Sequence, residues 1–285
     1  MNRFFAESLE EAEVALTAFE AHHAVDVLRL GAGEQVELFD GAGRTAVGRI
    51  VRAGRGKAAV RIEQLRPTIR RGGPLVHLAF AVPKGKRLDW LLEKAAELAA
   101  ASLRPVRFER SVAGGEMTEA KHSRWLAHCI AAAKQCGLNF LPQIRGPLSL
   151  HEFLADLGTR NREPGTGNAE HGTGNAEPGT GNREPGTGKR EAMGGRRFIR
   201  LLGDNSPSAC SVPEATAPSR GPCQLAIENR KLEIVILIGP EGGLTDAERQ
   251  ACVESGFTPV RLGSTALRIE TAAVALLAAV TALLG

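Results

Sequence analysis

Apolar segments that predict strands alternate with helical stripes in the second part of the chain. The apolar runs Val76–Val82, Phe198–Leu202 and Ile234–Ile238 predict strands buried on both faces of a sheet. Apolar residues at helical spacing predict a helix that Asp89 caps and that runs to about Ala101, and another over Ser123–Cys136. Alternating strands and helices indicate an α/β domain with a parallel sheet.

The first part of the chain has a different pattern, with short alternating segments typical of β-structure. Strand candidates are Gln35–Phe39, Ala46–Arg52 and Ala58–Leu65. Asp40-Gly41 predicts a hairpin turn, and one helix is expected at either Leu9–Phe19 or Ala21–Arg29. We therefore expect a small β-rich domain over residues 1–72 and the α/β domain over residues 73–285.

A glycine-rich turn follows the apolar run Ile234–Ile238. It reads Gly239-Pro240-Glu241-Gly242-Gly243, and its glycines allow a sharp turn and a close approach of a ligand to the backbone. Thr245 and Glu248 form a capping box, so a helix should start near Asp246. The turn has neither the dinucleotide fingerprint nor a Walker loop. A tight turn that binds nothing is the alternative.

A second glycine-bearing strand end lies nearer the carboxyl end of the chain. The short strand Pro259–Leu262 is followed by Gly263, by the charged residues Arg268 and Glu270, and by the apolar helix Thr271–Leu284. Charged residues at the start of an apolar helix cost free energy of burial unless they are paired or used. Two such strand ends suggest a cleft with two walls.

Two segments have the composition of loops. Residues 158–191 repeat a heptapeptide such as GTGNAEP, which has no apolar seam for a coiled coil and too little apolar surface to offset ordering entropy. We expect a disordered insertion over residues 158–196, with a folded repeat array as the alternative. Ser206–Pro222 is a second expected loop, rich in Pro, Ser and Ala.

Positive charge is concentrated in the first domain, although the net charge of the chain is only +4. Between residues 44 and 71 the single acid, Glu63, stands against nine basic residues: Arg44, Arg49, Arg52, Arg55, Lys57, Arg61, Arg66, Arg70 and Arg71. Arginines without aromatic neighbours indicate contact with phosphates rather than stacking on bases. A solvated strand face is the alternative.

The composition also excludes several classes of protein. The five cysteines form no C-x-x-C pair, which favours a reducing, cytoplasmic location. The histidines have no ligand spacing, so we expect no structural or catalytic metal. Residues 1–13 do not resemble a secretory leader, and the apolar helix Thr271–Leu284 is too short to span a membrane.

The motifs as a set resemble one enzyme family. GPEGG with a downstream LGSTALRIETA is similar to the SPOUT superfamily of methyltransferases, and in particular to the RsmE type, which methylates N3 of uridine 1498 in 16S rRNA. Further matching segments are Arg3-Phe4-Phe5, His22–Arg29, Val82–Leu98 and Lys134–Ile144. Two departures are Ser264-Thr265-Ala266 in place of Pro-Arg-Ile, and Leu138 in place of an arginine.

The resemblance implies an α/β trefoil-knot methyltransferase domain preceded by a PUA-like or OB-like β-barrel that grips RNA. It implies that S-adenosylmethionine lies against Leu237, Gly239, Pro240, Glu241, Gly242, Leu262, Gly263, Leu267 and Arg268. The RNA-binding candidates are Arg49, Arg52 and Arg61 of the basic strip, together with Lys84, Lys86 and Arg87 of a basic loop.

Methylation of N3 requires loss of the N3 proton and stabilisation of the charge that spreads over the uracil. Arg268 is the candidate for the electrostatic role, as a fixed cation near the developing anion. Its alternative role is an ion pair with Glu270 or Glu241. The proton acceptor stays open among Glu241, Glu270 and water, and Glu241 and Arg268 are the catalytic candidates.

The same motifs are compatible with other functions, and the apolar helix at the end of the chain bears on the assembly state. One alternative is an RNA-binding protein of this fold without catalysis, and another is a SPOUT methyltransferase for a different RNA base. The helix Thr271–Leu284 is apolar around its circumference, so one domain face should not cover it. We therefore expect a homodimer through this helix, acting on the 30S subunit or its 16S rRNA.

The insertion provides the first testable prediction. Joining Leu157 to Arg197, directly or through a short Gly-Ser linker, should leave the melting temperature and methyl transfer nearly unchanged, because long surface loops cost little. Thermal unfolding and a methylation assay measure both quantities. Loss of folding on deletion would contradict the prediction of disorder.

Overall fold

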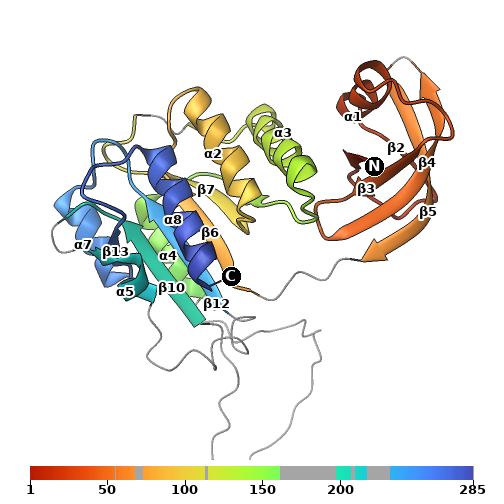
Figure 1. The fold of residues 1–285 in the computed structure, drawn as a ribbon. Coiled ribbons are helices and arrows are strands. Elements are labelled where there is room, and N and C mark those ends of the chain that lie inside the picture. Colours follow the sequence, from red (N-terminus) through yellow and green to blue (C-terminus); the bar gives the residue numbers. More distant parts are fainter. Residues whose placement is uncertain are drawn as a thin grey trace, which may run out of the picture.

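The computed structural model describes residues 1–54, 56–67, 73–112, 115–160, 197–206, 209–216 and 232–284. These residues form two separate sheets, one built from residues 2–67 and the other beginning at residue 75 (Figure 1). Most of the predicted insertion, and part of the predicted loop 206–222, lie outside the described residues.

The first sheet is a five-stranded structure with the order β1-β3-β4-β5-β2. Its elements are β1 (Asn2–Phe5), β2 (Glu13–Ala15), α1 (Ala18–His22), η1 (His23–Val27), β3 (Gln35–Phe39), β4 (Arg44–Gly54) and β5 (Lys57–Pro67). The three predicted strands and the hairpin at Asp40-Gly41 are confirmed. Of the two helix positions, residues 9–19 were wrong, because residues 13–15 pair with β5 and bury Val14.

The second sheet has eight strands, and all its strand pairs are parallel, as predicted. The order is β11-β13-β10-β12-β6-β7-β8, and β9 pairs with β7. The strands are β6 (Leu75–Phe80), β7 (Ser102–Arg107), β8 (Gln143–Ile144), β9 (Leu148–Ser149), β10 (Arg197–Gly203), β11 (Cys210–Ser211), β12 (Leu232–Ile238) and β13 (Thr258–Arg261).

Helices cover both faces of this sheet (Figure 1). They are α2 (Lys86–Glu97), α3 (Glu119–Cys136), α4 (Leu150–Arg160), α5 (Val212–Thr216), α7 (Asp246–Glu254) and α8 (Ile269–Leu284). Helices α2 and α8 pack together, and α8 lies on β12 and β6, while α4 lies on the opposite face. Among the described helices, none combines the length and apolar character that crossing a bilayer requires.

Several predicted boundaries were wrong for local reasons. Asp89 does not cap α2, which begins after Gly85, where a φ of +63° suits a glycine; the Asp89 carboxylate instead accepts a bond from Arg124 at 2.7 Å. Helix α4 extends to Arg160, so residues 158–160 belong to a helix rather than to the insertion, and a deletion should begin after Arg160. Residues 210–216 form β11 and α5 within the expected loop.

A buried ion pair joins the first sheet to the second domain at the carboxyl end of α3. The Lys134 ammonium donates to the Glu20 carboxylate at 2.7 Å, and the side chains are only 12% and 3% exposed. The same ammonium lies 3.2 Å from Nδ1 of His23 and 5.2 Å from the ring centre of Phe4. Burial lowers the pKa of His23, and Lys134 lowers it further, which keeps the imidazole neutral beside the ammonium.

Apolar contacts and a second cation complete this junction. Phe5 and Phe39 of the first sheet form a cluster with Ala133 of α3, against which Leu138 packs. The Arg3 guanidinium lies 4.3 Å from the ring centre of Phe39 and donates to the Leu138 carbonyl at 2.8 Å. The departure at Leu138 therefore lies at the contact between the domains.

The junction yields a prediction about stability. Lys134→Met should lower the free energy of unfolding by about 3 kcal/mol, because Glu20 would keep a buried charge without a partner. Urea denaturation measures the loss. Lys94→Met is the matched control, since Lys94 pairs with Glu97 in a more exposed position and its loss should cost much less stability.

The double variant Lys134→Met/Glu20→Gln removes both charges and should recover part of the lost stability. Equal, small losses for the Lys134 and Lys94 variants would show that the buried pair does not hold the two domains together.

Candidate functional site

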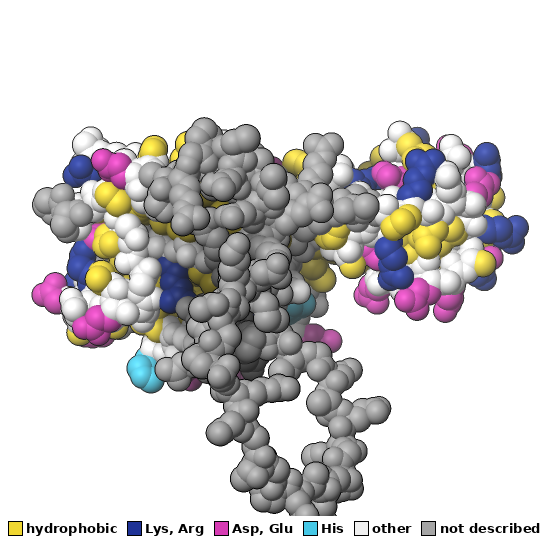
Figure 2. Space-filling model, turned by 90° about the horizontal axis from the view of Figure 1, so that it is seen from below, with side chains coloured by type: hydrophobic (Ala, Val, Ile, Leu, Met, Phe, Trp, Pro, Cys, Tyr) yellow, Lys and Arg dark blue, Asp and Glu magenta, His cyan; other side chains and the backbone are white. Residues whose placement is uncertain are grey.

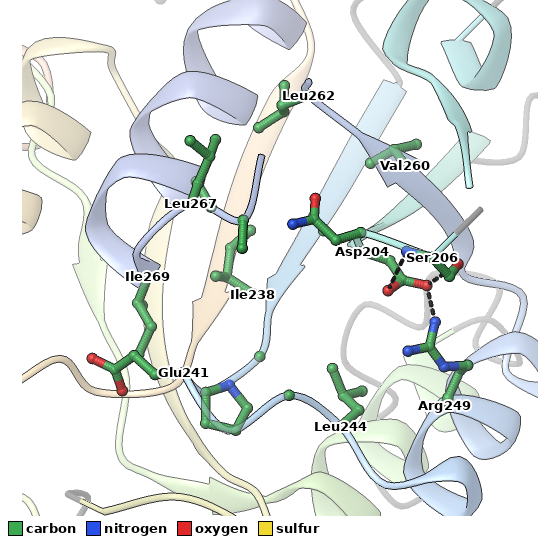
Figure 3. Close-up of a pocket in the computed structure, with 17 residues that line it drawn as sticks. Asp204, Ser206, Ile238, Glu241, Leu244, Arg249, Val260, Leu262, Leu267 and Ile269 are labelled. Carbon is green, nitrogen blue, oxygen red and sulfur yellow. Dashed lines mark hydrogen bonds and ion pairs between the residues drawn. The ribbon is translucent and has the colours of Figure 1, made fainter. Parts of the chain in front are cut away.

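A cavity of about 310 Å³ lies at the carboxyl ends of β10, β12 and β13 and beside the start of α8 (Figure 3). Parallel pairing sets Gly203 of β10 opposite Ile238 of β12, so both strands end at the same edge of the sheet. Val260 of β13 pairs with Gly203 on its other side. Ligands of open parallel sheets bind at this edge, which makes the cavity the leading candidate site.

The glycine turn after β12 forms one wall of the cavity. The amide of Gly243 donates to the Pro240 carbonyl at 2.9 Å, and Gly243 has a φ of +71°, which favours glycine. The predicted capping box follows, since Thr245 Oγ1 accepts from the Glu248 amide at 3.3 Å and the Glu248 carboxylate accepts from the Thr245 amide at 2.9 Å. The helix α7 therefore begins at Asp246, as predicted.

Missing side chains bring the backbone of the two main strands close to the cavity. A Cβ on Gly203 would lie 2.8 Å from Cδ1 of Ile238, and a Cβ on Gly239 would lie 2.5 Å from Cδ1 of Leu244. Both glycines line the cavity. No residue larger than glycine fits at either position, because the Ile238 and Leu244 side chains pack directly against these two backbone segments of the cavity wall.

The loop after β10 forms a second wall that the sequence did not reveal. Asp204 is nearly buried, and its carboxylate pairs with Arg249 of α7 and accepts from the hydroxyl of Ser206 at 2.7 Å (Figure 3). All three residues line the cavity. The sequence does contain a signal for this wall. The polar segment Gly203-Asp204-Asn205-Ser206 directly follows a buried strand, as the glycine turn directly follows β12.

The structure brings five of the nine predicted cofactor residues to the cavity: Gly239, Pro240, Glu241, Leu262 and Leu267. Gly242, Gly263 and Arg268 are neighbours of lining residues but do not line it, and Leu237 is fully buried in the sheet. Lining residues that were not predicted are Gly203, Asp204, Asn205, Ser206, Ile238, Gly243, Leu244, Arg249, Val260, Ala266, Ile269 and Ala272.

The charged residues at the mouth are paired differently from the expectation. Nη1 of Arg87 lies 3.5 Å from Oε1 of Glu241, and Nε of Arg87 lies 3.9 Å from Oε1 of Glu270. The suggested ion pair of Arg268 with either acid is therefore wrong, because Arg87 occupies that place. Arg268 is exposed, and among the described residues its guanidinium makes no ion pair or hydrogen bond.

Basic residues line the same edge of the sheet outside the cavity. Lys84 is exposed in the loop that leads from β6 to α2, and Lys86 is exposed at the first residue of α2. Arg110, in the loop after β7, donates to the Gly242 carbonyl at 3.1 Å and so lies directly against the glycine turn. These side chains give the mouth of the cavity a positive rim, which suits an anionic polymer.

Three arginines of the first domain form ion pairs with acidic residues, which the sequence did not indicate. Arg49 pairs with Glu63 at 2.8 Å, and both Arg52 and Arg61 pair with Glu13. Lys or Arg and Asp or Glu side chains are intermixed over this part of the molecule (Figure 2). The basic strip is therefore partly neutralised by an acid distant in the sequence, although all three arginine side chains are more than half exposed.

In the part of the chain that the structure describes, no group of three His, Cys, Asp or Glu side chains is placed to hold a metal ion.

Family models match both parts of the chain. A model described as an RNA methyltransferase domain matches residues 73–164 and 197–281, and a model described as an RNA methyltransferase PUA domain matches residues 16–63. The first match is interrupted between residues 164 and 197, where the heptapeptide repeat lies.

Curated relatives and solved structures agree with these models. Ribosomal RNA small subunit methyltransferase E of Synechocystis is 28% identical over 98% of this chain and 76% of its own length. The protein of that name from Bacillus subtilis is 24% identical over 99% of this chain and 96% of its own. A Neisseria gonorrhoeae structure of that name, bound to S-adenosylmethionine, has a TM-score of 0.72 and 26% identity, and the match covers 99% of this chain and 98% of that one.

Proposed function

The chain belongs to the RNA methyltransferase domain family, and on that premise we propose that it transfers the methyl group of S-adenosylmethionine to N3 of a uridine in 16S rRNA. The target that the sequence resemblance implies is uridine 1498. The similar proteins with curated names are small-subunit rRNA methyltransferases, which supports 16S rRNA as the substrate.

The observation that carries the proposal is the cavity at the carboxyl edge of the sheet. Its walls come from β10, β12, β13 and α8, and its lining includes Gly203 and Gly239, where no larger residue fits. The lining combines apolar side chains such as Leu262 and Leu267 with polar ones such as Asp204 and Ser206, which is typical of a site for a small organic cofactor. Gly203, Gly239, Leu262 and Leu267 would hold the cofactor, which supplies an electrophilic methyl group.

The protein must remove the N3 proton and stabilise the resulting anion. Bound S-adenosylmethionine would supply the methyl carbon to N3, with its sulfur as the leaving group in S-adenosylhomocysteine. Both acids pair with Arg87, but Glu241 lines the cavity and is partly exposed, whereas Glu270 is buried and does not line it, so Glu241 is the better placed proton acceptor. The exposed Arg268 guanidinium, next to the lining residue Leu267, would stabilise the charge on the uracil oxygens.

We assign three further properties to the same proposal. The carboxyl-terminal segment forms the trefoil knot of the SPOUT fold, although knots are rare in proteins. The protein works in the cytoplasm, in keeping with the free thiols of Cys129, Cys136, Cys210 and Cys252. The first domain grips RNA through Arg49, Arg52 and Arg61, and the rim of the cavity does so through Lys84 and Lys86.

A homodimer through α8 is also part of the proposal, but on a narrower face of the helix than expected. Leu276 and Val280 are fully buried within one chain, so they belong to the inner face of the helix and are not available to a second copy. The outer face carries the partly exposed residues Val274, Ala275 and Ala278. Their small side chains would let a second α8 approach closely, and Leu267 at the adjacent mouth is 39% exposed.

The reaction itself is tested on purified 30S subunits and on naked 16S rRNA with labelled S-adenosylmethionine. We expect methyl incorporation, with mass mapping locating 3-methyluridine in 16S rRNA. Arg268→Gln should lower kcat about 100-fold through the loss of a charge that stabilises the transition state. Arg261→Gln removes an exposed cation outside the cavity and is the matched control.

Three outcomes would contradict the proposal for the reaction. The first is binding of RNA without any methyl transfer, which fits the non-catalytic RNA-binding alternative. The second is a methyl group on another base, which fits the alternative of a methyltransferase for a different RNA base. The third is an equal kcat for both arginine variants, which removes Arg268 from the mechanism.

RNA binding by the first domain is tested by neutralising Arg49, Arg52 and Arg61 to glutamine. Glutamine is preferable to glutamate, which would repel Glu13 and Glu63 and confuse binding with stability. If each arginine contacts a phosphate, the slope of log affinity against log salt should fall by about 2 to 3.

The matched control for RNA binding neutralises Lys94, Arg107 and Arg124, which also form ion pairs but lie on the second domain. An equal change of slope in both triple variants would show only a loss of net charge.

The dimer is tested by Val274→Glu/Ala278→Glu, which places two charges on the outer face of α8. Light scattering should show a dimer for the unmodified protein and a monomer for the variant, with weaker binding of S-adenosylmethionine by titration calorimetry. The exposed Val253→Glu on α7 is the control. An unmodified protein that is monomeric at micromolar concentration would contradict the dimer.

A further inference from the structure

Arg87 connects two segments that are distant in the sequence and that flank the cavity. From the first turn of α2 it reaches Glu241 in the glycine turn after β12, at 3.5 Å, and Glu270 in the first turn of α8, at 3.9 Å. A guanidinium presents donors in a rigid fork, so one arginine can serve two carboxylates at a defined separation. Neither carboxylate lies on the helix that carries the arginine.

Glu270 depends on this contact more strongly than Glu241 does. It is only 7% exposed, and its Oε2 atom is buried without a hydrogen-bond partner. Within the described ranges, Arg87 is the one cation that forms an ion pair with it. A buried carboxylate costs much free energy unless a cation compensates it, so the position of α8 at this end is tied to Arg87.

Both carboxylates are next to the cavity, although Arg87 itself does not line it. Glu241 belongs to the lining, and the residues around Glu270 that line it are Ile269 and Ala272. A shift of the first turn of α8 would therefore move Ile269 and the preceding Leu267 relative to the glycine turn. The Arg87 bridge therefore joins residues of two walls of the cavity.

We propose that Arg87 is a positioning residue for the cofactor site. Its guanidinium holds the glycine turn and the start of α8 at the separation that S-adenosylmethionine requires. The inference rests on the proposed function, because it takes S-adenosylmethionine as the ligand of this cavity. It gives Arg87 a role in the cofactor site, beyond its predicted role as a phosphate contact in the basic loop. Arg87 acts through Glu241 and Glu270 and does not touch the reacting atoms.

The test is titration calorimetry of the full chain with S-adenosylmethionine, together with melting temperatures. Arg87→Gln should weaken cofactor binding about tenfold or more and lower the melting temperature. Arg124→Gln is the matched control, since it removes an arginine that pairs with Asp89 of the same helix α2, away from the cavity. The control should bind the cofactor as the unmodified protein does.

The double variant Arg87→Gln/Glu270→Gln separates positioning from simple charge compensation. Without the buried charge the melting temperature should return toward that of the unmodified protein, whereas cofactor binding should stay weak because the bridge is still missing. Recovery of both together would overturn the inference, as would unchanged binding by Arg87→Gln. If the unmodified protein bound no S-adenosylmethionine, the proposed function itself would fail, and the two failures are thus distinguishable.

Discussion

Parallel hydrogen bonding between β10, β12 and β6 is the constraint on which the candidate site depends. Its register pairs Gly203 with Ile238 and Ile238 with Phe80, so three loops leave the sheet at one edge. The loops after β10 and β12 become the walls of the cavity, and the loop after β6 leads to Arg87. A slip of register by one residue would turn each strand's inward residues outward and separate these loops.

Exposed basic residues lie at the same edge of the sheet as the cavity. Lys84 and Lys86 follow β6, Arg110 donates to the Gly242 carbonyl, and Arg87 is paired with Glu241 and Glu270. The buried pair Lys134–Glu20 fixes the first domain against α3, so its arginines keep a defined position relative to this mouth. Two ion-pair contacts between distant segments therefore fix the relative positions of the first domain, the glycine turn and the start of α8.

Sequence patterns predicted the local features of this molecule well. The strand before the glycine turn, the capping box at Thr245 and the parallel α/β architecture depend on neighbouring residues and were confirmed. Contacts between distant residues were not predictable in the same way. Several ion pairs join residues that are far apart in the sequence and come together only in the folded chain. They are Arg249 with Asp204, Arg87 with Glu270, and Glu13 with Arg52 and Arg61. At Asp89 the local pattern was misleading. The residue type is common at helix N-caps, but here the carboxylate forms an ion pair with Arg124 of another helix.

We propose that the cavity between the loops after β10, β12 and β13 holds S-adenosylmethionine. Amide hydrogen exchange of the full chain, with and without this cofactor, tests this binding most directly, because it reports on the backbone of each cavity wall. We expect slower exchange on binding at residues 203–206, 239–244 and 262–267, and little change in residues 2–67. Slower exchange confined to residues 2–67, or no change at these three loops under saturating cofactor, would contradict it.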